Sequence, residues 1–215
     1  MRGTVHALTL LERICAALPP GYPVLVAGGI AERDDVRAAL EAGAAAAVAG
    51  TRFLLSAESC AHPGYKRRLL GAETTLLTDL FGAGWPAPHR VVPNAATERW
   101  LGPVDAPPSR RRSSFGRNRS PKDERRRLRD ALRRAPAANR VLNHLMAPGS
   151  RYLPSSLQGR LIVAQRPGSR VLTPAGATDD GPGSLVEAGP LYAGETVARI
   201  GELRQAADLV RELAG

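Results

Sequence analysis

The stretch "PVLVAGGIAERDDVRAALEAGAAAAVAGTRFL", Pro23 to Leu54, decides the fold class of this chain. It reads as a strand, a glycine turn, a helix, a second strand and a second glycine turn. Residues 22–28 and 44–50 are short apolar runs, which are typical of strands buried on both faces. The segment between them, residues 32–43, has acids in its first turn and ends at a glycine, as helices do. Such a unit predicts two parallel strands joined by a right-handed crossover.

The rest of the chain is read from the spacing of its apolar residues and from its prolines and glycines. Residues 74–81 are expected to form a strand or extended arm, and residues 85–94, with three prolines, an irregular segment. Residues 166–184 read as a loop. Helices are expected at residues 7–18, 51–58, 63–72, 95–101, 123–134, 139–147 and 157–164. The tail, residues 194–215, reads as amphipathic helix, with one face formed by Val197, Ile200, Leu203, Ala207, Val210 and Leu213.

Positive charge is concentrated in one part of the chain. The window from Arg110 to Arg140 holds 13 Lys/Arg against three acids, a net +10 that equals the net charge of the whole chain. Residues 102–122, rich in Pro, Ser and Arg, read as a disordered linker. The basic run lacks interleaved aromatics apart from Phe115, so neither nucleic acid nor a membrane is the expected partner.

Composition sets the expected setting of the protein. The abundance of Ala, Arg, Gly and Pro indicates a high-GC, bacterial genome. Cys15 and Cys60 make no disulfide framework, which favours a reducing cytoplasm. The sequence has neither an apolar run of about 18 residues nor a signal peptide, so no membrane span is expected.

The two glycine turns of the opening stretch predict an anion site. Gly28-Gly29 and Gly50-Thr51 each follow a strand and precede a helix, where backbone N–H groups are free to bind phosphate. Glycine lets phosphate oxygens approach the backbone, and Thr51 adds a hydroxyl donor. In (β/α)8 barrels, the loops after strands seven and eight commonly form such a phosphate site together with a short extra helix.

The motifs "AGGI" at residues 27–30, "GTRFL" at 50–54 and "ESCAHPGYK" at 58–66 resemble the nitronate monooxygenase family, formerly called 2-nitropropane dioxygenases. FMN-dependent enoyl-ACP reductases share much of this pattern. The resemblance covers residues 1–101 and 184–215 well, and residues 102–183 only weakly. It implies an FMN-dependent (β/α)8 barrel that oxidises nitronates with O2.

Carried over onto this sequence, the resemblance assigns the cofactor-binding residues. Ala27, Gly28 and Gly29 of "AGGI" would bind the FMN phosphate, and Gly50 and Thr51 of "GTRF" would hold its other side. Glu195 stands where relatives often carry the glutamine of "AGQ". Because an acid would repel a phosphate, Glu195 is not assigned to the cofactor.

The resemblance also implies that the catalytic machinery is incomplete. The family's catalytic base is a histidine in a "GGH"-type loop, which is expected upstream of Met1, so no catalytic residue is assigned here. Two parallel strands cannot close a barrel, and they amount to about two of its eight strands. We therefore hypothesise that Met1 is a mis-assigned start, with a genuinely shortened product as the alternative. The substrate pocket would lie upstream as well, and the oligomeric state is open.

The expected fold class is thus α/β: an incomplete TIM (β/α)8 barrel with its last two βα units and a mostly helical C-terminal extension. Residues 1–80 are assigned to the flavin-binding barrel and 81–183 to an irregular and helical insertion. Residues 184–215 are expected to pack back on the barrel through the C-terminal helix. The alternatives are another phosphate-binding barrel oxidoreductase, such as an enoyl-ACP reductase, and a non-enzymatic basic interaction protein that uses residues 110–134.

Other residues with chemical potential receive ordinary roles. His62, which precedes Pro63, is expected to support a helix N-terminus, and His89 to lie in the irregular arm. None of the four histidines has a partner at metal-ligand or triad spacing, so no metal site is predicted. Arg52 has two readings, a phosphate contact or a structural ion pair. Asp34 and Asp35 favour the start of their helix.

Overall fold

The computed structural model describes residues 7–103, 132–149 and 152–215 of the 215-residue chain. The chain divides into two compact units, which are described separately below. Unit 1 consists of Met1–Ser59, Pro108–Asp130 and Gly194–Gly215. Unit 2 consists of Cys60–Pro107 and Ala131–Ala193.

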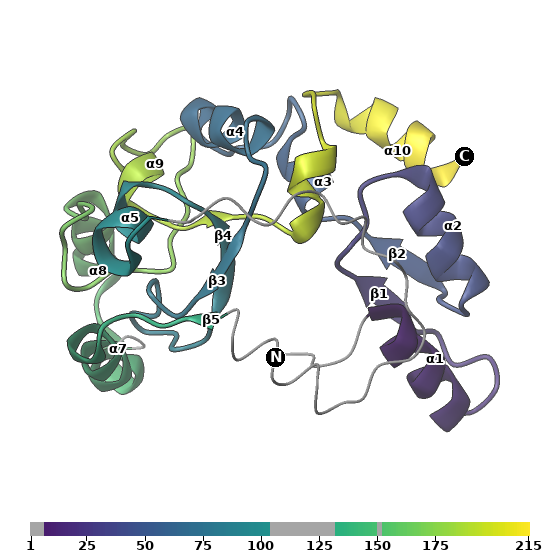
Figure 1. Ribbon diagram of the computed structural model, residues 1–215, viewed down its shortest axis with the longest axis horizontal. Coiled ribbons are helices and arrows are strands. Elements are labelled where there is room, and N and C mark those ends of the chain that lie inside the picture. The colour runs from purple at the N-terminus through teal and green to yellow at the C-terminus, as the bar shows by residue number, and fades with distance from the viewer. Residues whose placement is uncertain (1–6, 104–131, 150–151) are drawn as a thin grey trace. The chain divides into compact units, whose positions relative to one another are not determined.

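Unit 1 contains the predicted strand–helix–strand unit (Figure 1). Helix α1 (Ala7–Ala17) precedes β1 (Leu25–Ala27), α2 (Arg33–Glu41) and β2 (Ala46–Val48). The two strands are parallel, and their register pairs Leu25 with Ala46 and Ala27 with Val48. The prediction of a parallel pair joined by a helix is therefore confirmed.

The two strands of unit 1 are covered on one face. Val26 is buried in a cluster with residues of α1, α2 and the turns around them: Leu11, Ile30, Ala39 and Ala44. Leu25 and Val48 point the other way and are 61% and 45% exposed. The expectation of strands buried on both faces is wrong for the described residues, because α1 and α2 pack on a single face of this two-stranded sheet.

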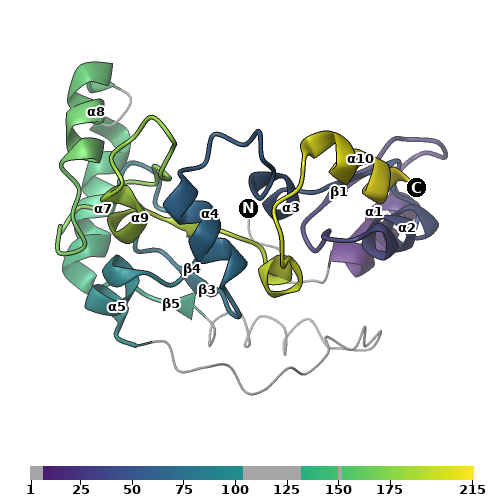
Figure 2. The same ribbon diagram turned by 90° about the horizontal axis from the view of Figure 1, so that it is seen from above.

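The tail of unit 1 is broken into two short helices. The 3₁₀ helix η2 (Glu195–Arg199) contacts α3 (Thr51–Leu54), and α10 (Ala206–Ala214) packs on α2 and α3. Both views show α10 beside α2 (Figures 1 and 2). The expected continuous apolar face is wrong, since Leu203 and Val210 are 45% and 54% exposed. The chain is extended at Ile200 and Gln205, so the helical phase does not carry through.

Unit 2 is built on a four-stranded sheet. Its strands are β3 (Leu76–Thr78), β4 (His89–Val92), β5 (Leu132–Arg133) and β6 (Leu191–Tyr192), in the order β5-β3-β4-β6. β4 runs antiparallel to both β3 and β6, whereas β5 is parallel to β3. The strand expected within residues 74–81 is confirmed.

Two expectations for unit 2 are wrong. His89–Val92 forms a strand and not an irregular segment. It pairs with β3 on one side and β6 on the other, and these strands supply its backbone hydrogen bonds. The flanking prolines have no N–H and cannot supply them. Leu132–Arg133, expected to end a basic helix, forms β5 instead. The rest of that expected helix and nearly all of the predicted linker, residues 102–122, lie outside the described residues.

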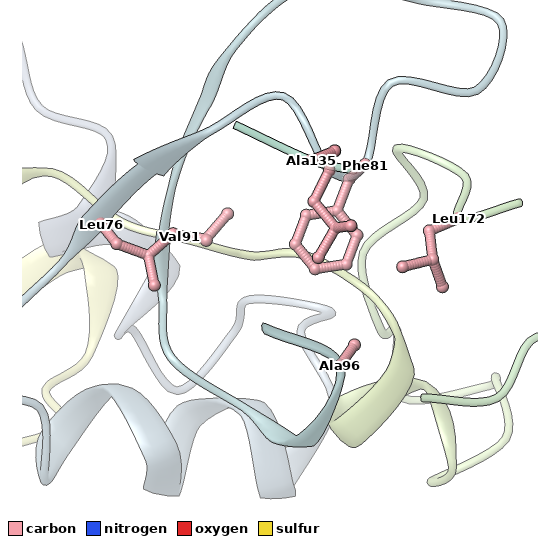
Figure 3. Close-up of a cluster of buried hydrophobic side chains, with 7 residues drawn as sticks. Leu76, Phe81, Val91, Ala96, Ala135 and Leu172 are labelled. Carbon is pink, nitrogen blue, oxygen red and sulfur yellow. The ribbon is translucent and has the colours of Figure 1, made fainter. Parts of the chain in front are cut away.

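The helices α4 (Pro63–Leu70), α5 (Ala95–Leu101), α7 (Ala137–Gly149) and α8 (Ser155–Val163) lie where the sequence predicted them. The short helix α9 (Leu185–Ala188) was not predicted. Figure 3 shows a core cluster of unit 2, in which Phe81 lies among small and branched apolar side chains. Its other members are Leu76, Leu80, Val91, Ala96, Ala135 and Leu172.

The α/β fold class is confirmed, but the described residues contain two open sheets and no closed barrel. The sheet of unit 1 has two strands, too few for closure. That these strands are the last two of a (β/α)8 barrel, and that the domains divide at residues 80 and 183, stay predictions.

Candidate functional site

The first predicted turn leaves open space at its glycines. Ala27 ends β1, and Gly28 and Gly29 follow with φ angles of +98° and +81°. This left-handed region is favourable for glycine and strained for other residues. A Cβ built on either glycine has no heavy atom within 4 Å. The turn can therefore accept a ligand atom close to its backbone.

The second predicted turn follows β2 and is equally open. Gly50 precedes α3, whose first residue is Thr51, and a Cβ on Gly50 would also meet nothing within 4 Å. The φ angle of Gly50 is −95°, which any residue can adopt. Because Ala27 and Val48 are paired in a parallel sheet, the two turns leave the same edge of that sheet side by side.

The free donors of the site are backbone amides of the turns themselves. Within the described residues, the N–H groups of Gly29, Gly50 and Thr51 have no protein acceptor. The segment just before α2 is different, because the amides of Ala31 and Glu32 both donate to Oδ2 of Asp35, at 2.9 and 3.0 Å. An anion here would thus meet the glycine turns and not these two amides.

Thr51 is tied to the C-terminal segment. Its Oγ1 accepts a 2.8 Å hydrogen bond from the backbone N–H of Gly194. The hydroxyl hydrogen is left to donate elsewhere. The predicted hydroxyl donor is consequently held in a fixed position by a residue 143 positions further along the chain.

An arginine lies beside the first turn. Nη2 of Arg199 is 2.6 Å from Oδ2 of Asp35 and 3.4 Å from the carbonyl oxygen of Gly29. Partial burial opposes ionisation of Asp35, but the guanidinium of Arg199 and two backbone amides outweigh it, so the pKa of this carboxyl is lowered. Asp35 therefore does more than favour a helix start.

Arg52 is placed as a structural residue. Its side chain is 6% exposed, donates to the carbonyl oxygen of Glu202 at 3.1 Å and lies 3.8 Å from a carboxylate oxygen of Glu212. This geometry supports a structural ion pair for Arg52 and not a phosphate contact.

The remaining predicted residues lie away from these turns in the sequence. Nδ1 of His62 accepts a hydrogen bond from the N–H of Gly64 at 3.0 Å, which confirms its role at the start of α4. His89 is buried in β4 against the rings of Trp85 and Tyr192. In the part of the chain that the structure describes, no group of His, Cys, Asp and Glu side chains could hold a metal ion. Over the same residues, no helix is long and apolar enough to span a membrane.

Gly194 and Arg199 were not predicted as site residues. Gly194 directly precedes Glu195 in the segment "YAGE", residues 192–195, and this position was a weak signal. Arg199 carried none, because one arginine among the 30 Lys/Arg of the chain has no local pattern that marks it.

Comparison with known proteins gives a consistent family match. The family model described as nitronate monooxygenase matches residues 1–156. The nitronate monooxygenase npaC of Metarhizium robertsii is 39% identical over 97 residues, covering 40% of this chain and 27% of the relative. The nitronate monooxygenase of Pseudomonas aeruginosa is 42% identical over 85 residues, covering 38% and 24%.

A third curated relative differs in its printed activity. It is the (3aS,4S,5R,7aS)-5-hydroxy-7a-methyl-1-oxo-octahydro-1H-indene-4-carboxyl-CoA dehydrogenase of Mycobacterium tuberculosis, 36% identical over 100 residues, covering 45% of this chain and 27% of the relative. The matched region thus spans about a quarter of the length of these curated relatives.

Two solved structures resemble the fold. FabK from Thermotoga maritima matches with a TM-score of 0.53 and 19% identity, covering 99% of this chain and 49% of that one. Nitroalkane oxidase from Streptomyces ansochromogenes matches with a TM-score of 0.51 and 26% identity, covering 98% and 43%. The chain therefore spans just under half of each of these structures.

Proposed function

Because this chain belongs to the nitronate monooxygenase family, we propose that it supplies the flavin-phosphate site of an FMN-dependent enzyme that oxidises nitronates with O2. The family is typically FMN-dependent. In this proposal β1 and β2 are the last two strands of a (β/α)8 barrel, which further strands would complete.

The observation that carries the proposal is the pair of open glycine turns at one sheet edge. Gly29 and Gly50 leave space that a Cβ would fill, and the adjacent amides have no protein acceptor in the described residues. Two adjacent sets of amides suit a phosphoryl group, which presents several acceptor oxygens. The residues present thus fit the phosphate end of FMN.

Each residue of the site has a defined share in binding. The amides of Gly29, Gly50 and Thr51 would donate to phosphate oxygens, and the Thr51 hydroxyl would add a further donor. Ala27 and Gly28 bring the backbone to the ligand at the end of β1. When bound, FMN supplies the electron acceptor for the nitronate and the partner for O2. The described residues would hold and orient the phosphate.

Gly50→Val tests this site without straining the backbone. The substitution places a branched side chain in the open space at a φ angle that valine tolerates, so the fold should persist while the FMN dissociation constant rises at least about a hundredfold. Flavin fluorescence measures the affinity. Gly201→Val is the matched control, because a Cβ on this glycine of unit 1 also meets nothing within 4 Å. Wild-type affinity in a folded Gly50→Val variant would contradict the proposal.

A second candidate function is a flavin-dependent dehydrogenase of a CoA thioester. The acid-free segment from Ala131 to Thr178 favours it, because it holds seven arginines and neither Asp nor Glu. Guanidinium groups bind phosphates well, and coenzyme A carries several. Arg160, Arg166 and Arg170 of this segment are exposed. Calorimetric titration with coenzyme A should then show salt-sensitive binding, and the candidate is dropped if no heat of binding is found.

The enoyl-ACP reductase alternative is separated by a different assay. Reduction of the bound flavin by NAD(P)H would favour that reading over nitronate oxidation. The alternative of a non-enzymatic basic interaction protein depends on residues 110–134, which lie almost entirely outside the described residues. We do not propose it.

A further inference from the structure

One short segment of the tail touches both glycine turns. We call Gly194–Arg199 the strap; it consists of Gly194 and the 3₁₀ helix η2. At its first end the N–H of Gly194 donates to Oγ1 of Thr51 at 2.8 Å. A Cβ on Gly194 would lie 3.4 Å from that oxygen, at ordinary van der Waals distance, so the strap packs closely on Thr51 here.

At its other end the strap reaches the first turn through Arg199. Nη2 of this residue bonds Oδ2 of Asp35 at 2.6 Å and lies 3.4 Å from the carbonyl oxygen of Gly29. Nη1 is 3.7 Å from a carboxylate oxygen of Glu32. One guanidinium therefore contacts the turn itself and two of the three acids that follow it, Glu32 and Asp35.

The middle of the strap is buried. Val197 is 1% exposed, and Ile200, which follows the strap, is 4% exposed. Buried apolar side chains fix a segment of this kind, because lifting it would expose them to water. The strap is thus held at three points: Thr51, the buried Val197, and the turn at Gly29.

We propose that the strap sets the spacing of the two glycine turns and that Arg199 is a positioning residue for the phosphoryl group they bind. This inference rests on the proposed function. Arg199 orients the Gly29 peptide through its carbonyl oxygen. It also neutralises Asp35 and Glu32, whose charges would otherwise repel an anion at this turn. Arg199 itself acts through the turn and the two acids, so it is not a catalytic residue.

A comparison of FMN with riboflavin isolates the phosphate contribution. In Arg199→Gln the FMN dissociation constant should rise roughly tenfold, the size expected for losing one charge-assisted contact, while riboflavin affinity stays unchanged. Arg199→Lys should recover part of the loss. Arg211→Gln is the matched control, because Arg211 makes an exposed ion pair with Asp208 on α10. A merely structural role would lower both affinities together, and that result, or unchanged FMN affinity, would overturn the inference.

Amide hydrogen exchange tests the strap without any ligand. In Arg199→Gln the amide of Gly194, which donates to Oγ1 of Thr51, should exchange roughly tenfold faster than in Arg211→Gln, because the strap loses one of its ends. Unchanged exchange at this amide would refute the strap. If the wild-type chain binds no FMN, the proposed function fails, and this exchange measurement then decides for or against the strap on its own.

Discussion

Replacing Gly29 with alanine separates two effects at the first turn: the cost of backbone strain in stability, and the loss of affinity for the proposed ligand. The φ angle of Gly29 is +81°, where an L-residue is disfavoured by roughly 1–2 kcal/mol. Loss of glycine's freedom in the unfolded chain returns about 0.4–1 kcal/mol. Since a Cβ there meets nothing within 4 Å, no clash is added. Gly29→Ala should therefore cost about 1 kcal/mol of stability and still fold.

Gly21 provides a closely matched control for this change. It belongs to the same unit, has the same φ angle of +81°, and a Cβ on it also meets nothing within 4 Å. Urea unfolding, monitored by circular dichroism, should give free energies of unfolding for Gly29→Ala and Gly21→Ala that agree within about 0.5 kcal/mol. Only Gly29→Ala should weaken FMN binding. If Gly29→Ala costs over 2 kcal/mol more than Gly21→Ala, the reasoning that this turn is open is refuted.

Three further predictions concern stability. His89 is buried, its Nε2 has no hydrogen-bond partner among the described residues, and desolvation lowers its pKa. Stability should therefore fall as pH drops below about 6.5, where the unfolded state gains the proton, and this slope should vanish in His89→Phe. The pKa of Asp35 is lowered, so its contribution to folding stability should be present above about pH 4 and should disappear as acid protonates the carboxylate in the folded state. Asp35→Asn should not show this acid-dependent loss of stability. Phe81→Ala should cost about 3–5 kcal/mol by urea unfolding, because this fully buried ring fills the centre of the cluster in Figure 3, and a cost under 1 kcal/mol would contradict that packing.

Local patterns in the sequence predicted most elements of the fold. The parallel pair and its helix follow from apolar runs separated by glycines, and the cap at His62 follows from the proline after it. β4 was missed because it is stabilised by pairing with β3 and β6, which lie elsewhere in the sequence. The prolines on either side of it also favour an irregular segment when only the local sequence is considered. The exposed face of β1 was missed for a similar reason. An apolar run indicates a strand but does not indicate whether other elements pack on one face of it or on both.

The candidate site was predictable in part. Its glycines are visible in the sequence because a turn with positive φ needs them, as at Gly28 and Gly29. The strap was not predictable, since the contact of Arg199 with Asp35 joins residues 164 positions apart. Only the folded chain shows that the same tail segment meets both turns.

The proposed site requires that amides at two adjacent strand exits bind one phosphoryl group jointly. The most direct test is to titrate the isotope-labelled chain with FMN and to follow the backbone amide signals by nuclear magnetic resonance. We expect the signals of Gly29, Gly50 and Thr51 to shift together along one binding curve, and riboflavin to leave them in place. Shifts confined to one turn, or an equal response to riboflavin, would contradict it.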